Sequence, residues 1–175
     1  MASLKVGRIA GLEVTAAPSV PLWGLALWVV LAGVGLFVLQ FSVLEAVLGG
    51  LAAAALHFVG EFIHQYGHSY AASATGYPMI GVRYWMLLAM SIYPRNEPEL
   101  PAAVHIRRAL GGPAFSILVG AVAGIITLLL GSGGVLWWLL AFFAFDNFFV
   151  FGLGAFLPLG FTDGSTLLYW WGKRG

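Results

Sequence analysis

The sequence contains no cysteine, and charged residues make up only 9% of its 175 residues, whereas hydrophobic residues make up 61%. The absence of cysteine excludes disulfide bonds and metal sites built on thiolates. So few charged side chains cannot coat a soluble globule, and the composition therefore predicts a polytopic membrane protein. The net charge is only +1, which gives no reason to expect a nucleic-acid partner. The length predicts a single domain, 1–175.

Four apolar stretches are long enough to cross a bilayer, because about 20 helical residues span the hydrocarbon. We expect these spans at 22–41, 43–75, 104–130 and 135–157. The second begins with a capping-box pattern, Ser42 and Glu45, and is longer than one crossing needs. The segment 76–95 is too short for a further span, so we expect a re-entrant or β hairpin there. The predicted fold class is all-α, with four transmembrane helices.

All eight lysine and arginine residues lie in or beside segments on one side of this four-span arrangement. The rule that cations stay inside predicts that this side, with both termini, faces the cytoplasm. Residues 1–21 carry charges before any apolar run and are expected to form a short cytoplasmic segment. The expected partners are membrane lipid and other transmembrane proteins, either subunits of a complex or a helical substrate.

A polar stripe runs along the second span, with His57, Glu61, His64 and His68 at spacings of 4, 3 and 4. These spacings place all four on one helix face, and titratable groups at membrane depth are costly. His64 and His68 can bind one metal ion from one helical turn. In the HExxH pattern a glutamate follows the first histidine and is the general base, but here the residue is Gln65, whose amide does not titrate. The alternative is a pair of buried histidines hydrogen-bonded to other helices.

A metal held by two histidines needs a third protein ligand. Glu61 is one candidate, but a straight helix spreads three ligands along its axis. Asp163 is the better candidate, because it follows a break in the fourth span at Pro158 and Gly160, and Gly164 allows the backbone to approach closely. Counted along their spans, the histidine pair and Asp163 reach a similar depth near the cytoplasmic face.

These residues lie in three motifs: HQYGH at 64–68, RALGGP at 108–113 and PLGFTDG at 158–164. In these motifs, over about residues 8–168, the sequence resembles the site-2 protease family of intramembrane zinc metalloproteases. The resemblance implies one zinc ion bound by His64, His68 and Asp163. It also implies cleavage of transmembrane helices near their cytoplasmic ends, with a glutamate as general base.

The departures from the family pattern lie where the chemistry would take place. Gln65 replaces the glutamate, Ala155 replaces the asparagine of the distal motif, and Ser116 stands where the family often has asparagine. Loss of a general base alone costs about 10²–10⁴ in rate. We therefore expect a degenerate, non-proteolytic member that serves as a scaffold or subunit of a membrane complex. The alternative is an active protease carrying an engineered glutamate-to-glutamine change. A transporter or channel is disfavoured, because the sequence has no inverted repeat.

Two further polar pairs are expected to be structural. His57 and Glu61 are four residues apart, a spacing at which helical side chains meet, so we expect them to pair with each other. Asp146 and Asn147 lie inside the fourth span and are expected to satisfy each other or a group on the third span.

Overall fold

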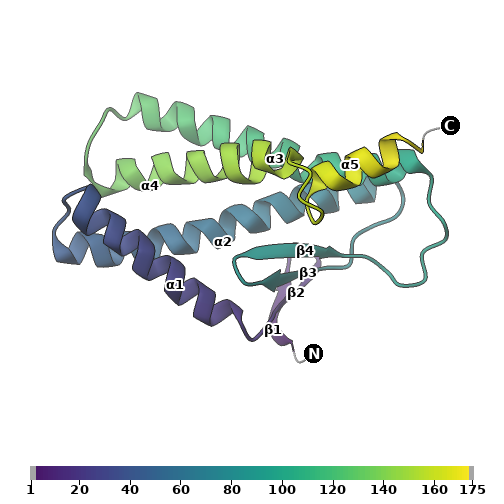
Figure 1. Ribbon diagram of the computed structural model, residues 1–175, viewed down its shortest axis with the longest axis horizontal. Coiled ribbons are helices and arrows are strands. Elements are labelled where there is room, and N and C mark those ends of the chain that lie inside the picture. The colour runs from purple at the N-terminus through teal and green to yellow at the C-terminus, as the bar shows by residue number, and fades with distance from the viewer. Residues whose placement is uncertain (1–2, 174–175) are drawn as a thin grey trace.

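The computed structural model describes residues 3–173, and its long helices lie side by side along the longest axis (Figure 1). The helices are α1 (Val20–Gly33), α2 (Val43–Ala74), α3 (Ala102–Leu129), α4 (Gly134–Phe145) and α5 (Asp163–Trp171). Among the described residues, the helices long and apolar enough to cross a membrane are Val20–Val38, Val43–Ala74, Ala102–Leu129 and Gly134–Phe156. Four predicted membrane helices are thus confirmed, the largest difference being that the first ends at Val38 instead of 41. The chain is an integral membrane protein.

The longest helix, α2, has 32 residues and begins with the predicted capping box. Glu45 donates its backbone N–H to the Ser42 hydroxyl, and its carboxylate accepts from the Ser42 backbone N–H at 3.0 Å. This arrangement satisfies donors that every helix N-terminus leaves unpaired. The helix ends at Ala74 with Thr75 as its C-cap; Gly76 then adopts φ +81° and Pro78 follows. α2 is therefore one long helix with a defined cap at each end.

Glycines bring α2 and α3 into backbone contact beside the histidine pair. A Cβ added at Gly67 would overlap the Gly111 carbonyl, and a Cβ added at Gly111 would overlap the Gly67 carbonyl. Farther along α3, toward its C-terminus, a Cβ at Gly120 would lie 2.5 Å from the Phe148 backbone nitrogen on the fourth membrane helix. Small residues permit such close packing between helices in a membrane. The third helix is therefore packed tightly against both α2 and the fourth membrane helix.

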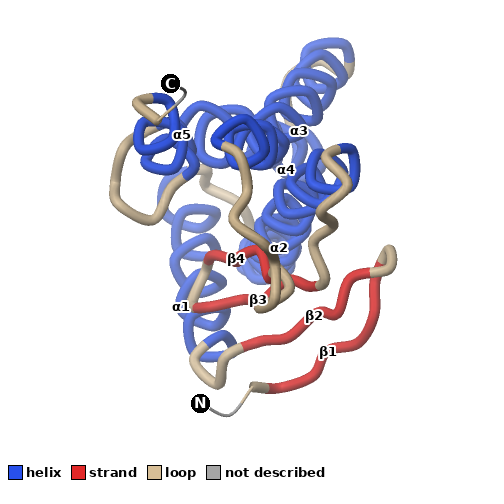
Figure 2. Tube along the Cα trace, turned by 90° about the vertical axis from the view of Figure 1, so that its right-hand side faces the viewer, coloured by secondary structure: helices blue, strands red, loops and turns tan. Residues whose placement is uncertain are grey.

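A four-stranded sheet lies beside α2 (Figure 2). Its strands, in spatial order, are β1 (Leu4–Ile9), β2 (Leu12–Ala16), β3 (Gly81–Trp85) and β4 (Leu88–Ile92). The pairs β1–β2 and β3–β4 are antiparallel, whereas β2 and β3 are parallel. The hairpin expected within 76–95 is confirmed as β3–β4. The two N-terminal strands were not predicted, because the charged residues in 1–21 indicated only a short cytoplasmic segment.

The sheet packs on α2 through a small apolar cluster. Leu12 on β2, Val82 on β3, Ala72 on α2 and the nearby Met79 are each at most 5% exposed. Alternate residues of β2 are buried, as expected for a strand with one face on a core. β4 is at the edge of the sheet, so the hairpin lies over the polar stripe of α2.

The fourth membrane helix changes from α-helical to π-helical geometry partway along its length. After α4 it continues as a π-helical segment, η2 (Asp146–Leu153), and a short 3₁₀ turn, η3 (Gly154–Phe156). The chain is then extended at Leu157, and α5 begins at Asp163. π-Helical segments inside α-helices often occur at functional sites. Here the break places the first residue of α5 against α2.

Candidate metal centre

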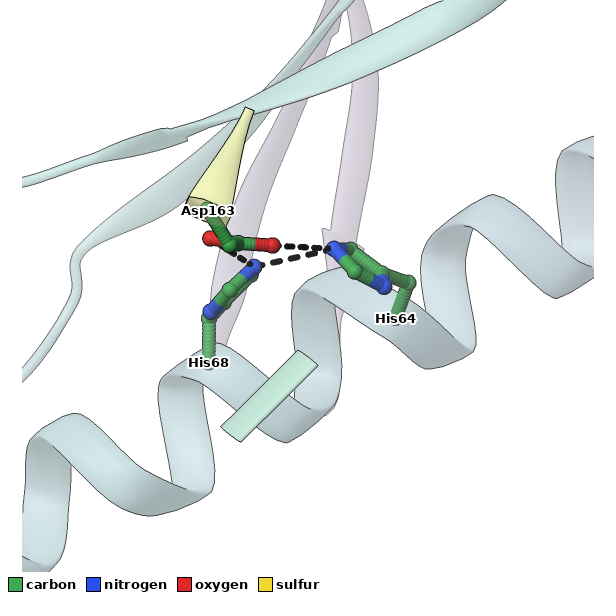
Figure 3. A group of neighbouring side chains, drawn as sticks. All are labelled: His64, His68 and Asp163. Atoms are coloured by element: carbon green, nitrogen blue, oxygen red, sulfur yellow. Dashed lines mark hydrogen bonds and ion pairs between the residues drawn. The ribbon is translucent and has the colours of Figure 1, made fainter. Parts of the chain in front are cut away.

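His64, His68 and Asp163 meet at one point, as the sequence predicted (Figure 3). The two Nε2 atoms are 3.0 Å apart. One Asp163 carboxylate oxygen lies 3.2 Å from His64 Nε2, and the other lies 3.4 Å from His68 Nε2. Both histidines are buried, and the Asp163 side chain is only 16% exposed. Each of the three offers one ligand atom, all within 4.8 Å of one another.

The remaining ring nitrogen of each histidine is held by α3. His68 Nδ1 lies 2.8 Å from the Arg108 carbonyl, which can only accept a hydrogen bond, so this nitrogen carries the proton. The Gly112 N–H also approaches His68 Nδ1, but at 3.3 Å this is the weaker contact. His64 Nδ1 lies 3.2 Å from the Ser116 hydroxyl, which accepts equally well. With Nδ1 of both rings donating to these acceptors, both Nε2 atoms are left as acceptors that face Asp163.

This arrangement fits a tetrahedral divalent cation. Two imidazole lone pairs and a carboxylate converge without a donor among them, so they repel one another unless a cation or a proton lies between them. Zinc bonded at about 2.0 Å in a tetrahedron would have ligand atoms about 3.3 Å apart. The two Nε2 atoms are 3.0 Å apart, and each lies 3.2 or 3.4 Å from a different oxygen of the Asp163 carboxylate, which is close to that spacing. Two histidines and one carboxylate also leave a fourth position open, as in catalytic zinc sites.

Asp163 is held in its ionised form by the same neighbours. Burial of its carboxyl opposes ionisation, but when His64 and His68 carry protons on Nε2, the hydrogen bonds and charges of these rings outweigh burial and hold the pKa of Asp163 below its usual value. Its position depends on Gly164, because a Cβ there would overlap the Phe156 carbonyl at the end of the fourth helix. The expected close approach at Gly164 is therefore present.

Gln65 belongs to a polar network between α2 and the edge strand β4. Its Nε2 donates to the Ala89 carbonyl at 3.0 Å and approaches Glu61 Oε1 at 3.4 Å. Its Oε1 accepts from the Ser91 hydroxyl at 2.8 Å. Glu61 Oε1 in turn accepts from the Ala89 backbone N–H at 2.6 Å. The side chain is thus used both as a donor and as an acceptor, which an amide can do and an ionised carboxylate cannot.

A cavity of about 720 Å³ opens beside the three ligands. Its polar lining includes Glu61, Gln65 and Arg108, and its apolar lining comes from β4, from the fourth helix and from the 157–161 loop. Ala155, where the family motif has asparagine, also lines it. The cavity therefore reaches His64, His68 and Asp163, which are also among its lining residues.

Both predictions about the other intramembrane polar residues were wrong. His57 does not pair with Glu61; its Nδ1 lies 3.0 Å from an Asp146 oxygen on the fourth helix. Glu61 instead accepts from the Ala89 backbone N–H of β4 at 2.6 Å. Asn147 donates to the Phe143 carbonyl of its own helix, not to Asp146 or α3. These partners lie far apart in the sequence or on a strand, so i, i+4 spacing alone could not identify them.

Three residues that support the site were not singled out as supports from the sequence. Ser116 and the Arg108 carbonyl orient the histidine rings, and Gly112 leaves room for them. A Cβ at Gly112 would lie 2.6 Å from His64 Nε2 and closer still to His68 Nε2. The sequence signal for Arg108 and Gly112 is the RALGGP motif at 108–113, which marked the beginning of a span but not its contact with α2, and Ser116 follows this motif.

No family model and no curated protein matches the sequence. Among solved structures, the chain is similar to the site-2 protease from Methanocaldococcus jannaschii, with a TM-score of 0.67 and 20% sequence identity. The match covers 95% of this chain and 70% of that chain. A similarity at this identity establishes the fold and leaves the activity to be argued from the site. The chain therefore has the fold of a site-2 protease.

Proposed function

We propose that this protein is an intramembrane zinc-binding protein of the site-2 protease fold that does not hydrolyse peptide bonds. It serves as a scaffold or subunit in a complex with other transmembrane proteins. Its termini lie in the cytoplasm, in agreement with the distribution of its cations. The proposal rests on one observation: the Gln65 side-chain amide joins α2 to β4, because its nitrogen donates to the Ala89 carbonyl and its oxygen accepts from the Ser91 hydroxyl.

Zinc, when bound by His64, His68 and Asp163, would polarise a carbonyl or acidify a water at the open position. Hydrolysis also needs a base to take the proton of that water. The Gln65 amide cannot serve, and its nitrogen is already committed to the Ala89 carbonyl at 3.0 Å. An ionised glutamate at this position would set a carboxylate oxygen against that carbonyl. The hydrogen-bond partners around position 65 therefore suit glutamine better than an ionised glutamate.

Zinc content is the direct test of the metal site. Protein purified without chelators is expected to contain about one zinc per chain, because three ligands converge at suitable separations. His64→Ala is expected to contain essentially none, since two ligands cannot hold the ion. Tyr66→Phe, between the two histidines on α2, should retain it. Zinc is measured by plasma mass spectrometry, and equal zinc in His64→Ala would refute the ligand assignment.

Gln65→Glu tests the absence of catalysis. We expect the variant to remain inactive on transmembrane-helix substrates in detergent or liposomes, since Ala155 and Ser116 also depart from the family pattern. We also expect a loss of about 1–3 kcal/mol in stability, because the Ala89 carbonyl loses its donor and meets a carboxylate. Zinc-dependent cleavage by the variant, abolished by His64→Ala, would contradict the proposal.

One observation favours the alternative, an active intramembrane protease in which glutamine was introduced at position 65. The cavity of about 720 Å³ is lined by His64, His68 and Asp163, so that a substrate segment bound in it would lie beside them. A glutamate at this position in protein from the native source, identified by peptide mass spectrometry, would support that alternative. A glutamine there would support the scaffold.

A further inference from the structure

A second buried polar cluster lies on α2, separate from the metal ligands. The His57 side chain is 10% exposed and that of Asp146 is 6% exposed. His57 Nδ1 lies 3.0 Å from Asp146 Oδ2, at the start of the π-helical segment η2. His57 Nε2 lies 3.0 Å from the Leu87 carbonyl, in the turn between β3 and β4. One imidazole thus joins three elements that are distant in sequence.

The two contacts of His57 require two protons. The Leu87 carbonyl can only accept, so Nε2 must carry a proton to keep that contact. The contact with Asp146 needs a second proton, which either Nδ1 or the carboxylate oxygen can carry. With both protons present, the pair is neutral overall and both contacts are satisfied. A neutral histidine beside an ionised aspartate could keep only one of them.

We propose that His57 and Asp146 form a proton-dependent latch that fixes the β3–β4 turn against α2 and the fourth helix. When the shared proton leaves, the remaining N–H stays with the Asp146 carboxylate, since a charge-assisted hydrogen bond is the stronger. Nε2 then faces the Leu87 carbonyl with a lone pair, and the turn is released. Within residues 3–173, the charged group beside His57 apart from Asp146 is Glu61 on its own helix, and Tyr84 on β3 binds the carbonyl of the adjacent Phe58. Burial raises the pKa of Tyr84, so its hydroxyl stays protonated and keeps its bond to the Phe58 carbonyl.

The turn that the latch holds is itself strained. Met86 adopts φ +56°, a left-handed conformation that costs a residue with a side chain about 1 kcal/mol or more. The next residue is Leu87, whose carbonyl His57 binds. The following strand carries Ala89 and Ser91, which contact Glu61 and Gln65 and line the cavity. His57 is therefore a positioning residue for the strand that covers the metal centre.

The latch can be tested by distance measurements between spin labels, because the chain has no native cysteine to remove. One label replaces Met90 on β4, which is 47% exposed, and the other replaces Tyr70 on α2, which is 63% exposed. Distances are measured by pulsed EPR between about pH 5 and about pH 9. A control pair at Tyr70 and Leu118 reports on α2 and α3 without the hairpin. The measurement requires no metal, so its outcome does not depend on the zinc site.

In the wild-type background we expect one narrow distance distribution at low pH and a broader, longer one at high pH. Asp146→Asn should remain narrow at every pH, because the asparagine amide donates to Nδ1 while neutral His57 still donates to Leu87. His57→Ala should be broad throughout. A wild-type distribution that does not change with pH, or an Asp146→Asn variant that opens as the wild type does, would overturn the proposal.

Discussion

Gly112→Ala is expected to abolish zinc binding, with a loss of affinity of more than about 100-fold. The added methyl group would lie 2.6 Å from His64 Nε2 and would overlap His68 Nε2, the two atoms through which both histidines would bind zinc. Neither ring can retreat freely, because Ser116 and the Arg108 carbonyl hold their other nitrogens. The overpacked helix contact also costs about 1–3 kcal/mol in stability. Zinc content and competition with a fluorescent chelator measure the effect.

Gly124→Ala is the matched control. It makes the same change on the same helix, but the added Cβ would meet only Ala144 Cβ at 3.9 Å, which is ordinary contact. We expect normal zinc content and unchanged or slightly higher stability, since alanine favours a helix more than glycine does. If Gly112→Ala bound zinc as well as Gly124→Ala does, the metal could not lie between the two histidines in this geometry.

Arg108→Ala is expected to cost about 3 kcal/mol in stability, because it breaks a buried ion pair. The guanidinium binds both Glu97 carboxylate oxygens, at 2.5 and 3.0 Å, and donates to the Tyr77 carbonyl at 2.6 Å. It also lies 4.1 Å from the centre of the Tyr93 ring. The figure is at the lower end of the usual range, because the Glu97 side chain keeps 19% exposure and can be partly hydrated when unpaired.

Arg107→Ala changes the same charge one residue earlier, at an exposed position. It should cost less than about 0.5 kcal/mol. Arg108→Lys should fall between the two, since lysine keeps the charge but not the planar fork that binds both oxygens. Unfolding is followed by thermal or denaturant titration in detergent micelles. Equal destabilisation by the two alanine variants would show that the Glu97 pair contributes nothing specific.

The membrane helices and the convergence of His64, His68 and Asp163 were predictable because their signals are local. The capping box of α2 lies within four residues, and the histidine pair within one turn. Asp163 could be found because Pro158 and Gly160 interrupt an apolar run beside it. In each case a short stretch contains both the pattern and the physical reason for it.

The remaining features depend on contacts between distant segments. His57 and Asp146 are 89 residues apart, and nothing beside either one indicates the other. The parallel pairing of β2 with β3 joins residues on either side of two membrane helices. The π-helical turn of the fourth helix, which directs Asp146 toward α2, likewise has no reliable local signal. Such features are decided by packing, which a single sequence does not display.

The length of α2 determines from which side of the membrane the candidate metal centre can be reached. Its 32 residues extend about 48 Å, well beyond the roughly 30 Å of bilayer hydrocarbon. His64 lies 21 residues after Val43, which is about 32 Å along the axis from the capped end. The ligands therefore lie where the helix leaves the hydrocarbon on the side of the 76–101 loop. In sealed vesicles, zinc should exchange with the aqueous pool on that side alone, and an impermeant chelator should strip it from one face only.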